Sequence, residues 1–116
     1  MGMTNVASAA PARTLVETAE ALSTFLTFIT EKVATDHRER GYSFLLDTTF
    51  SLDFGPKFVK IVRRDGTGSR SVYGFVSHAD GRIWKAASWK APAKNFSRGN
   101  IFEPKTWNCA GVYGVA

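Results

Sequence analysis

The chain contains little of the chemistry that marks a metal site, a disulfide framework or a membrane span. Cys109 is the only cysteine, so no internal disulfide can form, and a lone thiol is typical of a reducing compartment. The two histidines do not cluster with it as zinc ligands would. No apolar run approaches the roughly 20 residues of a membrane span, and the first residues lack the features of a signal peptide. We expect a cytoplasmic protein with no metal, no cofactor and no membrane contact.

A catalytic set is also missing from the sequence. His78 and Asp80 fall in one predicted turn without a nucleophile close in sequence, and Cys109 has no neighbouring base. His37 lies among charged residues at the end of a predicted helix. These patterns favour a binding protein over an enzyme, and we name no catalytic residue.

The 116 residues are enough for one domain with a modest core. Residues 1–12 are small, polar and interrupted by proline, which predicts a flexible tail before a single domain over residues 13–116. Residues 1–56 carry four basic and seven acidic side chains, whereas residues 57–105 carry eleven basic and three acidic ones. This asymmetry indicates that one part of the fold meets an anion. The alternative is that the basic side chains only solvate a small domain.

A long helix is predicted near the N-terminus. Thr14–Glu17 fits a capping box, and the helix is expected to end near Arg40, with Gly41 as its C-terminal cap. Phe25 lies on the flank of the apolar stripe, and Phe28 lies behind it, where it would be exposed in a monomer. The stripe consists of Leu15, Ala19, Leu22, Leu26, Ile29 and Val33.

Strand patterns follow the helix. Apolar and polar residues alternate over residues 44–54, and turn signals lie at Gly55–Pro56, at residues 65–69 and at residues 78–81. The fold class that we predict is therefore α+β, with one long N-terminal helix packed on a four-stranded antiparallel β-meander. The four predicted strands span residues 44–54, 58–63, 71–76 and 82–89.

The segment Ile83–Lys94 combines aromatic rings with cations. Trp84 and Trp89 differ by an odd number, so in a continuous strand they would face opposite sides of the sheet, and one of them would be exposed or lie under the C-terminal tail. The alternative is that both tryptophans pack in a small core. An exposed tryptophan beside lysines can stack on a base while the lysines meet phosphates. We therefore predict single-stranded DNA or RNA as the partner, bound with little sequence specificity. The predicted binding residues are Lys85, Trp89, Lys90, Lys94 and Arg98, supported by Arg63, Arg64 and Arg70.

Two other functions fit the same sequence. The first is a protein-interaction module that inhibits a host or partner protein, with its basic surface on an acidic protein surface or as a homodimer. Its contacts would be Phe28, Trp107 and Tyr113, because the uncharged residues 107–116 can form a further strand, an edge cover or an oligomer contact. The second is a pocket for a small anionic nucleotide, which the mixture of cations and rings permits without specifying.

Four segments together resemble a known group of proteins. They are Lys57–Val62 (KFVKIV), Ser71–Val76 (SVYGFV), Asp80–Lys94 (DGRIWKAASWKAPAK) and Arg98–Ile101 (RGNI). This pattern, which covers residues 57–102, is similar to that of small uncharacterised proteins encoded by bacteriophages. The resemblance implies a phage origin, and hence a place in the cytoplasm of a host cell. It implies no activity.

Overall fold

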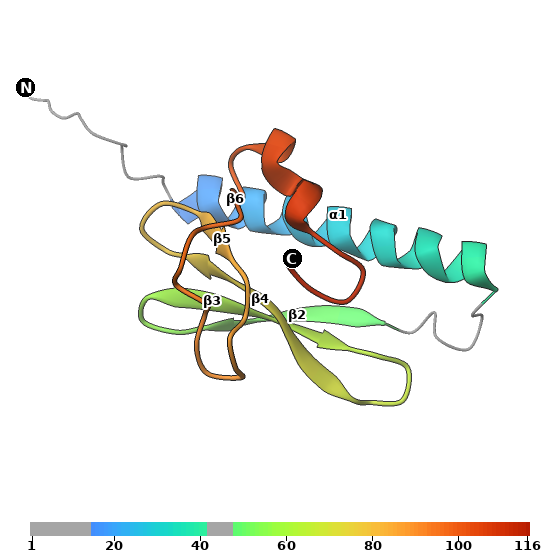
Figure 1. Cartoon of the computed structure of the whole chain (residues 1–116). Helices are drawn as coiled ribbons and strands as arrows, with labels where there is room; N and C mark the ends of the chain where they lie inside the picture. Colours follow the sequence, from blue (N-terminus) through green and yellow to red (C-terminus); the bar gives the residue numbers. More distant parts are fainter. Residues whose placement is uncertain (1–14, 42–47) are drawn as a thin grey trace, which may run out of the picture.

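The computed structural model describes residues 15–41 and 48–116, with the side chains of the helix described from Glu17 onward. One helix lies along one side of an antiparallel sheet (Figure 1). The predicted tail, Thr14 of the capping box and residues 44–47 of the first predicted strand lie outside the described residues. The elements are α1 (Leu15–Arg40), β2 (Thr49–Phe54), β3 (Phe58–Arg64), β4 (Arg70–Ser77), β5 (Arg82–Trp84), β6 (Gly99–Asn100) and the 3-10 helix η2 (Pro104–Cys109).

The buried side of α1 is wider than its predicted stripe. Leu22, Ile29 and Val33 are buried as predicted, but Ala19 is exposed. Phe25, predicted on the flank, is fully buried, because the ring of Trp107 packs against it with centroids 5.1 Å apart. The C-terminal segment therefore covers a second flank of the helix. This is a long-range contact that helical periodicity does not contain.

The sheet confirms the α+β class and the antiparallel arrangement, with neighbouring strands in the order β2-β3-β4-β5-β6. Its first three strands form the predicted meander, in which Leu52 pairs with Ile61 and Ile61 with Gly74. Side chains that are paired in this way point to the same side of the sheet. The side facing α1 carries Val59, Ile61, Val76 and Ile83, which join the helix in one apolar core.

The prediction of four strands is wrong, because the sheet has five. β5 ends at Trp84 rather than near Trp89, and the chain then leaves the sheet and returns as β6. The excursion is closed by a bridge between Ala86 and Pro92 and by hydrogen bonds within residues 87–91. Since Trp84 and Trp89 do not share a strand, strand parity no longer relates their directions.

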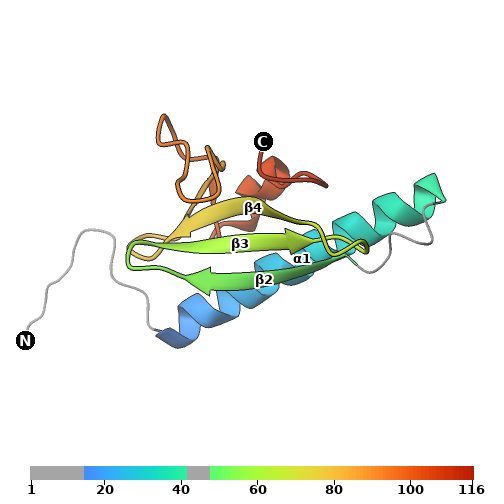
Figure 2. The ribbon, with the colours of Figure 1, turned by 90° about the horizontal axis from the view of Figure 1, so that it is seen from below.

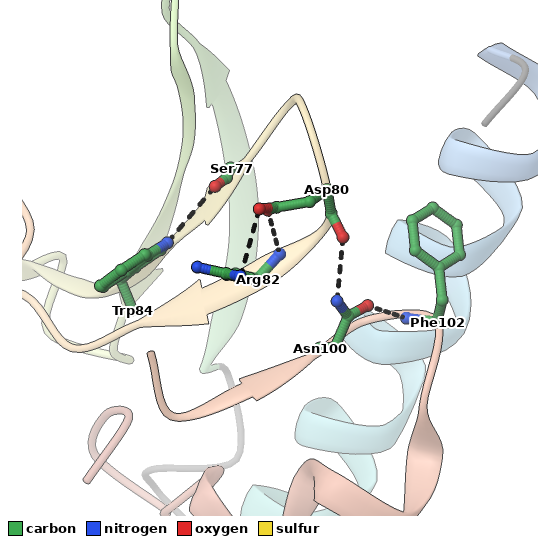
Figure 3. A network of polar contacts seen from close by, with 6 residues as sticks. All are labelled: Ser77, Asp80, Arg82, Trp84, Asn100 and Phe102. Atoms are coloured by element: carbon green, nitrogen blue, oxygen red, sulfur yellow. Dashed lines mark hydrogen bonds and ion pairs between the residues drawn. The ribbon is translucent and has the colours of Figure 1, made fainter. Parts of the chain in front are cut away.

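A polar network fixes β6 against the turn between β4 and β5 (Figure 3). The Asn100 side chain donates a hydrogen bond to the Asp80 carbonyl (2.9 Å) and accepts one from the Phe102 backbone N–H (2.9 Å). On β5 itself, Arg82 pairs with the Asp80 carboxylate at 3.2 Å, and the Trp84 indole N–H donates to the Ser77 hydroxyl. This network stabilises the edge from which the excursion over residues 85–98, here called the 85–98 segment, departs and to which it returns.

Candidate functional site

The side of the sheet turned away from α1, here called the outer face, carries cations and aromatic rings. Figure 2 shows β2, β3 and β4 in front of the helix, and Figure 1 shows the 85–98 segment extending to the side of the sheet away from α1. The strand register aligns one row of side chains across this face, in which Lys60 pairs with both Asp53 and Phe75, and Phe75 pairs with Trp84. The row thus places two charged groups, Asp53 and Lys60, beside two aromatic groups, Phe75 and Trp84.

Trp89 lies over this face in contact with two cations. The Lys60 ammonium is 4.3 Å from the centroid of a Trp89 ring, and the Arg70 guanidinium carbon is 5.5 Å from it. These are distances at which a cation interacts favourably with the indole π-system. The Trp89 residue is 41% exposed, so the ring combines cationic neighbours with an accessible surface.

A groove of about 380 Å³ opens on the outer face. Phe58 and Phe75 belong to its lining, with their rings edge to face and centroids 6.1 Å apart. The Lys94 ammonium is 5.7 Å from the Phe58 ring centroid, and Lys90 lines the groove from the 85–98 segment. The full lining consists of Asp53, Gly55, Pro56, Lys57, Phe58, Lys60, Phe75 and Lys90.

Of the predicted binding residues, Lys90 lines this groove. Lys94 and Trp89 contact the lining residues Phe58 and Lys60, and Arg70 contacts Trp89. Arg64 lies on the same face, because it pairs with Arg70, and Lys85 is exposed at the start of the 85–98 segment. Sequence reasoning did not select four residues that line the groove, namely Lys57, Phe58, Lys60 and Phe75. For two of them the signal is present in β3, where Phe58 and Lys60 alternate with the buried Val59 and Ile61.

Two predicted residues lie elsewhere. The Arg98 guanidinium stacks on the Phe96 ring at 3.8 Å and donates hydrogen bonds to the Ala116 carbonyl and the Asn95 side chain. Arg63 points to the helix side of the sheet, opposite to Arg64, and is only 8% exposed. Neither side chain therefore belongs to the groove.

The residues predicted as partner contacts have three different environments. Trp107 is 5% exposed, and its indole N–H donates to the Asn100 carbonyl (2.9 Å), so it belongs to the core. The Phe28 ring is partly exposed and packs on Trp107 with centroids 5.3 Å apart. Tyr113 is largely exposed, and its ring lies against the Arg63 guanidinium. The segment over residues 104–115 is thus mainly a cover for the core.

Two titratable groups, Tyr73 and Cys109, have raised pKa values. Burial raises the pKa of the Tyr73 hydroxyl far above its usual range, and this hydroxyl donates to the Gly111 carbonyl at 2.6 Å. Burial also raises the pKa of the Cys109 thiol, which disfavours the reactive thiolate. Within residues 15–41 and 48–116, no three His, Cys, Asp or Glu side chains gather as a metal site would require.

These features define a small α+β protein whose sheet carries a basic, aromatic outer face. Residues 5–110 match a family of unknown function, DUF7717, and the chain belongs to this family. No curated protein and no solved structure matches the chain. In the described part of the chain, no helix is long and apolar enough to cross a membrane.

Proposed function

We propose that the protein binds single-stranded nucleic acid along the outer face of its sheet, with little sequence specificity. The observation that carries the proposal is the environment of Trp89, an accessible indole with Lys60 and Arg70 at its ring and a cation-lined groove beside it. Bases stack on aromatic faces whatever their sequence, and lysine and arginine neutralise the phosphates between them.

The binding mode follows from the arrangement of the side chains. Lys60, with a side chain only 14% exposed, keeps its ammonium near Trp89 and 4.0 Å from the Asp53 carboxylate, so its charge is fixed at the centre of the face. Lys90 and Lys94 lie on the 85–98 segment at the rim. A strand following the groove would place a base on an aromatic ring and phosphates beside Lys60 and the rim lysines.

A salt titration tests this proposal. We expect a fluorescent oligothymidylate of about 15 nucleotides to bind at low salt, and the logarithm of its affinity to fall linearly with the logarithm of the salt concentration. The double variant Lys90→Gln/Lys94→Gln should bind more weakly and with a shallower slope. Arg38→Gln/Lys105→Gln removes two exposed charges outside the groove and is the matched control. Absent binding at low salt, or an affinity indifferent to salt, overturns the proposal.

Melting and competition measurements with mononucleotides decide whether the ligand is nucleic acid or a free nucleotide. If the groove holds only one nucleotide, mononucleotides should raise the melting temperature and compete fully with the oligonucleotide. Binding that strengthens with oligonucleotide length supports the extended surface.

The phage origin, the host setting and the cytoplasmic location that the sequence suggests stay predictions.

We propose, as a second candidate, that the chain associates with a second copy of itself. A hollow of about 490 Å³ on α1 has Phe28 and Val112 in its lining, with three acidic side chains and one basic one, which are Glu31, Asp36, Glu39 and Lys32. Its charge is complementary to the basic outer face of another copy. Such a head-to-tail contact joins two different surfaces and extends into rings or filaments.

Sedimentation at low and high salt tests the second candidate. Association at low salt that is lost in Glu31→Gln/Glu39→Gln supports it, and a monomer under all conditions overturns it. Because both candidates use the outer face, oligonucleotide should dissociate such an assembly, whereas the monomer result leaves the nucleic-acid proposal intact.

A further inference from the structure

Arg63 is a buried cation without a charged or hydrogen-bonding partner among the residues that the structure describes. It lies on the helix side of β3, between Phe50 on β2 and Ser71 on β4, and is 8% exposed. Its Nε is buried and has no hydrogen-bond acceptor. Burying this N–H without an acceptor is costly unless a ligand compensates it.

The nearest carboxylate in sequence does not meet this need. One oxygen of Asp65 accepts hydrogen bonds from the backbone N–H of Thr67 (2.9 Å), the Thr67 hydroxyl (2.6 Å) and the backbone N–H of Ser69 (3.2 Å). The carboxylate thus organises its own loop. Its charge favours Arg63 from a distance, without an ion pair.

The guanidinium lies against an aromatic ring. Its central carbon is 5.1 Å from the centroid of the Tyr113 ring, and Tyr113 is 62% exposed. Stacking engages the face of a guanidinium and leaves the N–H groups at its edge able to donate in their own plane. The Tyr113 ring therefore does not use up the hydrogen-bond donors of the guanidinium.

The turn that carries Tyr113 is held in place. The Gly111 N–H donates to the Gly114 carbonyl (3.0 Å), the Val115 N–H donates to the Tyr73 carbonyl (2.9 Å), and the Tyr73 hydroxyl donates to the Gly111 carbonyl. Ser71, directly opposite Arg63 on the same side of the sheet, is exposed and carries a hydroxyl.

We propose that Arg63, Tyr113 and Ser71 form a binding site for a phosphate group, separate from the outer face and independent of the proposed function. The guanidinium supplies the charge and paired donors, and the two hydroxyls suit the further oxygens of a tetrahedral anion. Free phosphate and the terminal phosphate of a nucleotide or nucleic acid share this chemistry.

The site is tested on the full-length protein labelled with 15N, through the Nε–H resonances of its arginines. Sodium phosphate should shift the Arg63 resonance in a saturable way that sodium chloride of equal ionic strength does not reproduce. Arg63→Lys keeps the charge but loses the fork, and should weaken phosphate binding about tenfold or more. Arg38→Lys, exposed on α1 and outside both sites, is the matched control and should bind phosphate as the unaltered chain does.

Two further arms identify the source and protect the test. The site is assigned to nucleic-acid ends if a 5′-phosphorylated oligothymidylate shifts the Arg63 resonance at a lower concentration than phosphate does, and its 5′-hydroxyl counterpart does not shift it. The site is assigned to free phosphate if phosphate acts at the lower concentration. Tyr113→Phe retains the stacked ring and should weaken binding about threefold, which gives a readout if Arg63→Lys does not fold. No shift with phosphate, or equal phosphate affinity in Arg63→Lys, overturns the site.

Discussion

Trp107 and Trp89 lie on opposite sides of one sheet, and their indole rings have different environments. Trp107 lies between the rings of Phe25 and Phe28 and directs its indole N–H to a backbone carbonyl. Trp89 has Lys60 and Arg70 at its ring and remains 41% exposed. The first environment is dry and apolar, and the second is charged and open to water.

The difference teaches which aromatic residues this fold uses for packing. A core tryptophan removes apolar area from water and satisfies its single donor, and Trp107 does both. A tryptophan with cations at its ring gains less from burial and offers a face on which a ligand can stack. Stability and binding should therefore respond separately to substitutions on the two sides.

Trp107→Ala should give the largest effect. Its removal leaves a cavity between α1 and η2, and should lower the free energy of unfolding by about 3–5 kcal/mol, measured by urea denaturation followed by circular dichroism. Trp107→Phe should lose less, because it keeps a ring against Phe25. A loss below about 1 kcal/mol would show that the C-terminal segment does not cover the core.

Trp89→Ala should separate binding from stability. We expect the free energy of binding to single-stranded oligonucleotide to weaken by about 1–3 kcal/mol, the range for one stacked base. Fluorescence anisotropy measures this change. The free energy of unfolding should change by less than about 1 kcal/mol. Phe96→Ala removes another exposed ring, away from the groove, and is the control. Equal losses in both variants would contradict a specific role for Trp89.

Tyr73→Phe tests the helix side of the sheet through pH. Removing the buried hydroxyl should cost about 1 kcal/mol near neutral pH, because its hydrogen bond to Gly111 is lost. Since folding raises the pKa of this hydroxyl, its contribution is complete below the ordinary tyrosine pKa near 10 and falls as the unfolded chain ionises above it. Urea denaturation from neutral to alkaline pH should show a smaller decline in Tyr73→Phe than in the unaltered chain.

Lys60→Gln should give the smallest effect. Loss of one phosphate contact should reduce the salt slope of single-strand binding by roughly 0.7, with only a modest change in affinity at low salt. Lys105→Gln, on η2, should leave the slope unchanged. An unchanged slope in Lys60→Gln would place the phosphates away from the centre of the outer face.

The parts of the fold that could be predicted are those that repeat locally. The alternation that includes β2 and the Asp80–Gly81 turn signal identified the meander, and Leu22, Ile29 and Val33 identified the buried side of α1. β6 could not be found in this way, because two residues contain no period. Its pairing depends on the polar network of Asn100, which joins segments distant in sequence.

The candidate site was predicted in part for the same reason. Trp89, Lys90 and Lys94 are close in sequence and stand out as a cluster of rings and cations. Lys60 joins them only through the register of β3 and the return of the 85–98 segment over the sheet. Arg63 and Arg64 are neighbours in sequence, yet strand alternation sends them to opposite sides, so a count of charges alone cannot assign them to one surface.

β6 has a consequence for how the chain meets its own copies. Gly99 and Asn100 are the only residues of this edge strand, and the Asn100 backbone already accepts from Trp107 and donates to the Thr106 hydroxyl. The edge thus presents no continuous row of free amides and carbonyls on which a further strand could grow. It protects this edge of the sheet against the edge-to-edge pairing that leads to aggregation, while the Trp89 ring on the outer face stays exposed.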